Sequence, residues 1–157
     1  MKKILIALDD SASAMRAVEY AGSQFAGIGD LEIALVHVLP NLPAMFWDEG
    51  HILNDEEKKE RKKVVDKWVA DRKAKIETVF KNAGEALARA GVKASQVRTK
   101  SISDSTDVSS SLLEAAKDGG YQTLIVGRCN HTARHLLGSV SGKIVNQASG
   151  TAVTVVG

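Results

Sequence analysis

Residues 4–11, ILIALDDS, run from a continuous apolar segment into two aspartates and a serine. An uninterrupted apolar run of this length is typical of a strand that is buried on both faces, as the central strands of a parallel sheet are. A helix should follow directly, because Ser11 or Ser13 can cap it and apolar residues recur at helical spacing up to Gly27. The start of the chain therefore predicts a strand and then a helix of an α/β protein.

Outward from this segment, the same two patterns alternate along the whole chain. Apolar runs predict three further strands, at residues 31–39, 124–126 and 152–156, and alternating polar and apolar residues at 96–102 predict a strand nearer the edge of the sheet. Helical periodicity predicts a long helix over residues 55–90, a helix that is capped from residues 103–106 and ends at Gly119, and a helix over residues 140–148. This alternation predicts an α/β fold: an open, doubly wound, five-stranded parallel sheet with helices on both faces.

The long helix is expected to have one apolar face and one solvated face. The apolar face comprises Val65, Trp68, Val69, Ile76, Val79, Phe80, Ala83 and Leu87. Acidic and basic residues alternate over residues 56–63, and such mixed signs stabilise an exposed helix without making a patch that binds phosphate.

Length and composition limit the possible classes of protein. A chain of 157 residues with 44% hydrophobic and 25% charged residues has the size of one globular domain, so we expect a single domain over residues 1–157. The net charge of +2 creates no strong field, so we expect neither nucleic acid nor a membrane as a partner. Met1 leads into a strand instead of a signal peptide and Cys129 is the single cysteine, so we expect a cytoplasmic protein.

A sheet of this kind carries its ligand site at the carboxyl ends of the strands, where the winding direction reverses. Residues 7–11 place carboxylates just past the first strand. Residues 127–139 lead from the fourth strand to a helix start, where free backbone amides and the helix dipole favour phosphate. A hydrogen-bond acceptor at one end and an anion site at the other suit a nucleoside with its phosphates.

Five segments together carry a family resemblance. They are ILIALDDS at 4–11, LVHV at 35–38, LIVG at 124–127, LLGSVS at 136–141 and AVTVV at 152–156. As an ordered set they resemble the universal stress proteins. The resemblance implies an adenine nucleotide alpha hydrolase-like fold that binds an adenine nucleotide, ATP or AMP, with or without Mg²⁺. It also implies a regulatory or signalling module of the stress response instead of an efficient enzyme, so any ATP hydrolysis should be slow.

The resemblance assigns roles to residues at three strand ends. Asp9 matches an aspartate that meets the ribose, and Val38 matches a valine that meets the adenine. Gly127, Gly138 and Ser139 match parts of the motif Gly-x2-Gly-x9-Gly-Ser, which surrounds the phosphates. The nucleotide-binding residues implied in this way are Ala7, Leu8, Asp9, Val38, Gly127, Arg128, Asn130, Gly138, Ser139, Val140 and Ser141.

The middle of the phosphate motif departs from the family pattern. Asn130 stands in place of the second glycine, and seven residues instead of nine lie between it and Gly138. Asn tolerates left-handed backbone angles better than most residues, so the turn can survive. Arg128, Arg134 and His135 could replace phosphate contacts that a shorter loop loses. The alternative is a dimeric interaction module of the same family that does not bind nucleotide.

Several of these residues also have plain structural interpretations. Asp9 can simply cap the first helix, and Ser139 can cap the last one. His37, in the middle of a strand, is expected to be a structural histidine with a satisfied hydrogen bond.

Two other classes of site are weaker hypotheses. Asp9 and Asp10 resemble the acidic pair of phosphoacceptor receiver domains, with Asp104 as the third carboxylate, but no lysine follows the last strand. Cys129, His131 and His135 could also bind zinc, but the sequence has no second cysteine pair to complete such a site. Cys129 with His131 could act as a nucleophile, but no orienting partner is identified for them.

We expect a homodimer through the last strand, from Thr151 to Val156. This strand is short, apolar and β-branched, and an open sheet edge of that kind invites pairing about a two-fold axis. The irregular segment at residues 41–50, which includes Met45, Phe46 and Trp47, is a second candidate surface, either for the dimer or for a protein client that the sequence does not identify.

Overall fold

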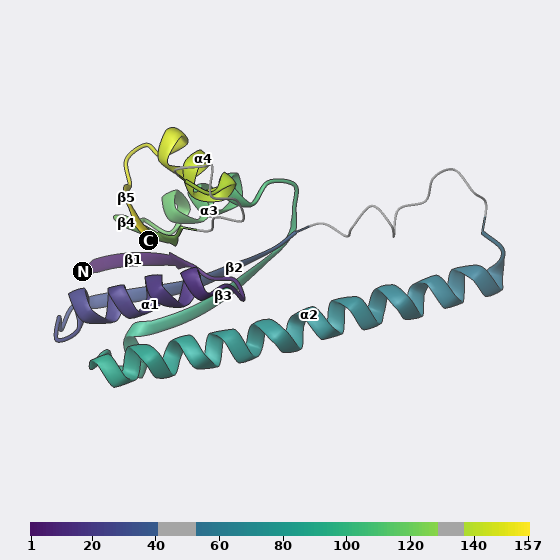
Figure 1. Cartoon of the computed structure of the whole chain (residues 1–157), viewed down its shortest axis with the longest axis horizontal. Coiled ribbons are helices and arrows are strands. Elements are labelled where there is room, and N and C mark those ends of the chain that lie inside the picture. The colour runs from purple at the N-terminus through teal and green to yellow at the C-terminus, as the bar shows by residue number, and fades with distance from the viewer. Residues whose placement is uncertain (41–52, 129–136) are drawn as a thin grey trace.

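The computed structural model describes residues 1–40, 53–128 and 137–157 and confirms the predicted open, doubly wound parallel sheet. Its strands pair in the order β3-β2-β1-β4-β5, all parallel (Figure 1). The strands are β1 (Lys2–Ala7), β2 (Leu31–Pro40), β3 (Val97–Ser105), β4 (Thr123–Gly127) and β5 (Ala152–Val156). The helices are α1 (Ala12–Phe25), α2 (Asp55–Ala90), α3 (Val108–Asp118) and α4 (Ser139–Gln147), with a 3-10 turn η2 (Ala94–Gln96).

The sheet lies between two helical layers because its central strands are apolar on both faces. Ile4 and Ile6 of β1 pack in the core with α1 and α2, whereas Leu5 between them packs with α3 and α4. Figure 1 shows these two pairs of helices on opposite sides of the sheet. Burial on both faces explains why the central strands appear in the sequence as continuous apolar runs.

Helix α2 has the predicted bounds and clear signals at both ends. Asn54 Oδ1 accepts a hydrogen bond from the backbone N–H of Glu57 at 2.8 Å, and Glu57 Oε2 accepts one from the N–H of Asn54 at 2.9 Å. Gly91 ends the helix with a left-handed φ of 101°, a conformation that favours glycine. None of the helices in the described ranges is long and apolar enough to cross a membrane.

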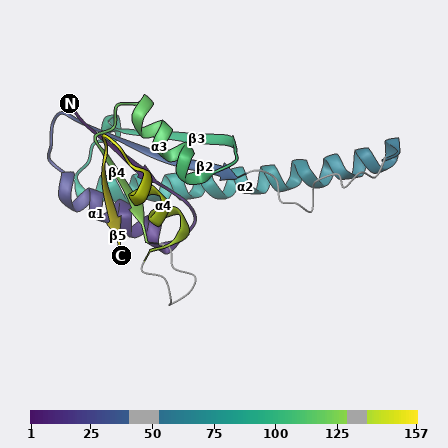
Figure 2. The same cartoon turned by 90° about the horizontal axis from the view of Figure 1, so that it is seen from above.

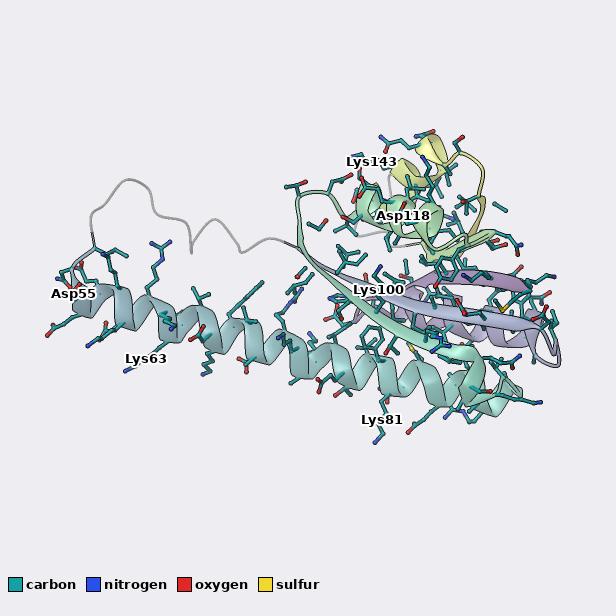
Figure 3. The ribbon with its side chains drawn as sticks, turned by 180° about the vertical axis from the view of Figure 1, so that it is seen from behind. Asp55, Lys63, Lys81, Lys100, Asp118 and Lys143 are labelled. Carbon is teal, nitrogen blue, oxygen red and sulfur yellow. The ribbon has the colours of Figure 1, made fainter. Side chains whose placement is uncertain are left out.

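The predicted apolar face of α2 is buried only in the second half of the helix. The buried residues are Ile76, Ala83, Ala86 and Leu87. Figures 1 and 2 show the first half projecting past the carboxyl ends of the strands, and in Figure 3 Asp55 and Lys63 lie on it while Lys81 lies on the half along the sheet. The predicted apolar face is thus fully buried only from Ile76 onward and half-buried at Val65, Trp68 and Val69, because the sheet is shorter than the helix.

The predicted cap of the third helix is also corrected. Residues 103–106 were expected to form a turn and cap, but β3 continues to Ser105, which pairs with Pro40 after a register shift in β2. Asp107 caps α3 instead: its side chain accepts a hydrogen bond from the N–H of Ser110 at 3.0 Å. Asp107 also forms an ion pair with Lys143 of α4 at 3.0 Å and so joins the two helices of this layer.

Candidate functional site

A cleft of about 460 Å³ opens at the carboxyl ends of β1, β2 and β4. It lies where the strand order changes direction, because β2 and β3 extend from β1 on one side and β4 and β5 on the other. Nine of the predicted site residues line it: Ala7, Leu8, Asp9, Val38, Gly127, Gly138, Ser139, Val140 and Ser141. The structure therefore brings together residues from three distant parts of the sequence.

Of the other two predicted residues, Arg128 is not among the described residues that line the cleft. Arg128 donates its backbone N–H to the carbonyl of Val156 at 2.7 Å, and its buried Nε atom has no hydrogen-bond partner among the described residues. Asn130 lies outside the described residues, as do the four other polar residues named with this loop: Cys129, His131, Arg134 and His135.

Asp9 lies at the turn after β1, but it does not cap α1. The cap is Ser11, whose Oγ accepts a hydrogen bond from the N–H of Ala14 at 3.2 Å. Asp9 Oδ1 accepts a hydrogen bond from the N–H of Ser11 at 2.8 Å, which holds the exposed carboxylate beside the cleft. Within the described chain its Oδ2 has no protein donor, so this oxygen is available to accept a hydrogen bond from a ligand hydroxyl.

His37 is a structural histidine, as predicted. Its ring is 8% exposed, and Nδ1 lies 2.8 Å from the backbone carbonyl of Leu8. Because a carbonyl only accepts hydrogen bonds, Nδ1 carries the proton. The backbone N–H of Leu8 donates to the carbonyl of Val36 at 2.8 Å. Residues of β2 therefore bind both the N–H and the carbonyl of Leu8, the residue that follows β1.

Gly127 has a packing role that the sequence did not indicate. A Cβ atom at this position would lie 2.3 Å from the carbonyl oxygen of Ser13 and 2.8 Å from the backbone nitrogen of Ala14. The end of β4 therefore touches the backbone of the first turn of α1, and only glycine allows this approach. Gly127, Ser13 and Ala14 all line the cleft, so this contact lies at its wall.

The start of α4 supplies free backbone donors. Gly138 is the residue before the helix and has no side-chain cap, so the prediction that Ser139 caps α4 is wrong. The first backbone hydrogen bond of the helix runs from the N–H of Gly142 to the carbonyl of Gly138, at 2.8 Å. The amides of Ser139, Val140 and Ser141 have no acceptor among the residues that the structure describes, and all three residues line the cleft. Together with the helix dipole, they form a site for an anion.

Comparison with known proteins decides the family. The model of the universal stress protein family matches residues 1–156. The chain belongs to the universal stress protein family. Among solved structures, this universal stress protein is similar to a family member from Burkholderia pseudomallei, with 21% identity and a TM-score of 0.66 over 99% of this chain and 95% of that one.

Two further similar structures contain nucleotides. One is a universal stress protein in complex with cAMP, with 18% identity and a TM-score of 0.64 over 99% of this chain and 96% of that one. The other is the universal stress protein from Archaeoglobus fulgidus in complex with dAMP, with 15% identity and a TM-score of 0.63 over 100% of this chain and 98% of that one. A search of curated protein sequences finds no match.

The cleft of this universal stress protein also includes side chains that sequence reasoning missed. Lys75 of α2 forms an ion pair with Asp10 at 2.5 Å, and this hydrogen bond lowers the pKa of the Asp10 carboxyl below its usual value. Arg72, one helical turn earlier, lines the cleft directly. From α3, Val108 and Leu112 add an apolar wall. No pattern in the sequence indicates that α2 passes the end of β1.

The rival interpretation of the acidic pair gains no support from the fold, whereas Cys129, His131 and His135 lie outside the described residues. In a receiver domain the third strand lies next to the first, whereas here β2 lies between β3, which contains Asp104, and β1, which leads to Asp9 and Asp10. Over the described ranges, no three His, Cys, Asp or Glu residues are grouped so that they could hold a metal ion.

Proposed function

We propose that this universal stress protein binds an adenine nucleotide in the cleft and acts as a ligand-dependent regulatory module in the cytoplasm. The observation that carries the proposal is the chemical division of the cleft. A free carboxylate oxygen lies at the end of β1, an apolar wall lies beside β2 and α3, and free amides lie at the start of α4. A nucleotide has the complementary parts: hydroxyls, a base and phosphate.

Each part of the ligand has a defined place in this proposal. The base packs on Val38, Val108 and Leu112, all of which line the cleft. The ribose hydroxyls donate to Asp9, whose second oxygen has no other donor in the described chain. The phosphates accept hydrogen bonds from the amides at the start of α4. The cAMP and dAMP complexes of the two similar structures support an adenine nucleotide as the ligand class, and we propose ATP, with or without Mg²⁺, as the first ligand to test.

We also propose that binding is not followed by efficient turnover. Asp10, the second carboxylate at the cleft, is held by Lys75 at 2.5 Å, and the Nδ1 proton of His37 is committed to the carbonyl of Leu8. A colorimetric phosphate-release assay with ATP and Mg²⁺ tests this part, and turnover at the rate of a typical ATPase, above about 1 s⁻¹, would contradict it.

Calorimetry with adenosine, AMP, ATP and GTP tests the binding proposal. We expect the adenine compounds to bind, and Asp9→Asn to weaken them about 10- to 100-fold, which is the scale of losing a hydrogen bond to a charged group. Asn retains an Oδ1 acceptor for the N–H of Ser11, so the turn itself is preserved. The proposal fails if the wild-type protein shows neither heat nor a thermal shift with any adenine nucleotide at millimolar concentration.

The second candidate function is a dimeric interaction module, with or without a ligand. It is favoured by β5, which among the described residues pairs with β4 alone and leaves its other side as an edge of the sheet. We propose a homodimer through the strand from Thr151 to Val156, with a protein client as a further partner. An unpaired edge strand exposes backbone donors and acceptors that a second copy can satisfy.

A further inference from the structure

Arg72 lies where α2 leaves the rest of the molecule. It comes one helical turn before Ile76, the first buried residue of the helix, and it lines the cleft. No segment of the phosphate motif includes it, because the motif follows β4 and α2 follows β2. Arg72 therefore contributes to the cleft from an element that the family motif does not cover.

The charges around the cleft make this position important. Of the described residues that line it, Asp9 and Asp10 are acidic and Arg72 is the only arginine or lysine, while His37 has its Nδ1 hydrogen-bonded to the carbonyl of Leu8. Lys75 pairs with Asp10 at 2.5 Å and Arg72 also interacts electrostatically with Asp10, whereas Asp9 has no ion-pair partner among the described residues. A phosphate that enters the cleft adds more negative charge beside that carboxylate. Arg72 is the cation within the described lining that can offset it.

The guanidinium of Arg72 has N–H groups that form no hydrogen bond with the described residues. It lies over the ring of Trp68, 5.7 Å from the ring centroid, and is only half-buried. The described residues provide it with no carboxylate in hydrogen-bond range and no carbonyl acceptor. Stacking on an aromatic face restricts the orientation of an arginine but leaves its in-plane N–H groups free, and these match two phosphate oxygens at once. Arg72 is thus a pre-oriented donor that has no hydrogen-bond acceptor in the part of the chain that the structure describes.

We infer that Arg72 binds the phosphate of the nucleotide, so that α2 supplies selectivity for phosphorylated ligands over the bare nucleoside. This inference rests on the proposed nucleotide-binding function. It gives the helix that projects beyond the sheet (Figure 2) a direct contact with the ligand, since Arg72 lines the cleft one helical turn before the first buried residue of α2.

The test compares adenosine with AMP and ATP in three variants. Arg72→Gln removes the charge, Arg72→Lys keeps the charge but loses the planar fork, and Lys73→Gln is the control. Lys73 is the next residue of the same helix, is exposed, and does not line the cleft. We expect Arg72→Gln to weaken AMP and ATP about 10-fold or more and to leave adenosine within 2-fold. Arg72→Lys should lie between it and the wild type, and Lys73→Gln should match the wild type.

The outcomes separate this inference from the proposed function. If the wild type binds adenine nucleotides and Arg72→Gln binds AMP as tightly, the inference is overturned while the proposed function stands. An equal loss for adenosine and AMP also overturns it, because Arg72 would then only support the shape of the cleft. If the wild type binds none of the three ligands, both fail together. Circular dichroism of each variant confirms that the helices are intact, and Arg72→Lys decides the question if Arg72→Gln does not fold.

Discussion

Replacing Gly127 by alanine tests whether the contact between β4 and α1 shapes the cleft. The added Cβ atom would lie 2.3 Å from the carbonyl oxygen of Ser13, 2.4 Å from its carbonyl carbon and 2.8 Å from the nitrogen of Ala14. All three are backbone atoms in the first turn of α1, so no side-chain rotation can relieve the overlap. Either the start of α1 or the end of β4 must move.

The expected cost follows from the size of this overlap. Overpacking by one carbon costs about 1–3 kcal/mol, and here it outweighs the roughly 0.5–1 kcal/mol that alanine normally gains over glycine within a strand. For a chain of this length, each kcal/mol changes the melting temperature by about 2–4 °C. The net loss is then about 0.5–2 kcal/mol, so we expect Gly127→Ala to melt roughly 1–8 °C below the wild type and to bind adenine nucleotide more weakly.

Gly84→Ala is the matched control. Gly84 lies inside α2, and a Cβ atom there meets nothing within 4 Å. The same substitution should stabilise the protein by about 0.5–1 kcal/mol, because glycine is a poor helix former. Urea unfolding followed by circular dichroism measures both variants. A Gly127→Ala protein as stable as the wild type would show that the close approach of β4 to α1 is not required.

Two further predictions concern the dimer edge and the layer of α3 and α4. The N–H of Ala152 donates to the carbonyl of Gln122 and the carbonyl of Val156 accepts from the N–H of Arg128, so Ala152 and Val156 face β4 and the alternation along the strand places the N–H of Val155 on the outer edge of β5. Val155→Pro should therefore leave the sheet folded and convert a wild-type dimer to a monomer in light scattering. A folded variant that stays dimeric would place the interface elsewhere. Hydrogen bonds from Ser110 and Lys143 lower the pKa of Asp107 to about 2, so its contribution to stability is complete above about pH 4 and is lost as the pH falls through 2. In urea unfolding from pH 6 to pH 2, the stability difference between the wild type and Asp107→Asn should narrow below pH 4, and a constant difference would contradict this.

The strands and most helix boundaries could be predicted because they depend on local patterns. The run at residues 4–8 is apolar at every position, which requires burial on both faces, and the structure has β1 at the centre of the sheet. The 36 residues of α2 were predicted with both ends correct because Gly91 ends the helix and no proline interrupts it. The local signal failed at Asp107, where pairing of β3 with β2 extended the strand past the predicted turn.

About half of the candidate site could likewise be predicted from local sequence patterns. The ends of β1 and β4 and the start of α4 could be identified, since strand ends and helix starts have recognisable chemistry and the topology brings them to one edge. The contribution of α2 could not be identified. The charges of Arg72 and Lys75 look like those of any solvated helix face, because their meaning depends on which residues of other elements lie beside them.

By itself, then, the sequence determined the order of strands and helices, the hydrophobic layers, and the edge of the sheet at which a ligand would bind, since each depends on periodicity or on a short chemical motif. The tertiary structure alone decided that Gly127 must be glycine, that α2 is buried only from Ile76 onward, and that Arg72 lines the cleft. These features depend on distances between residues far apart in the chain, and such distances are set by how the helices pack on the sheet.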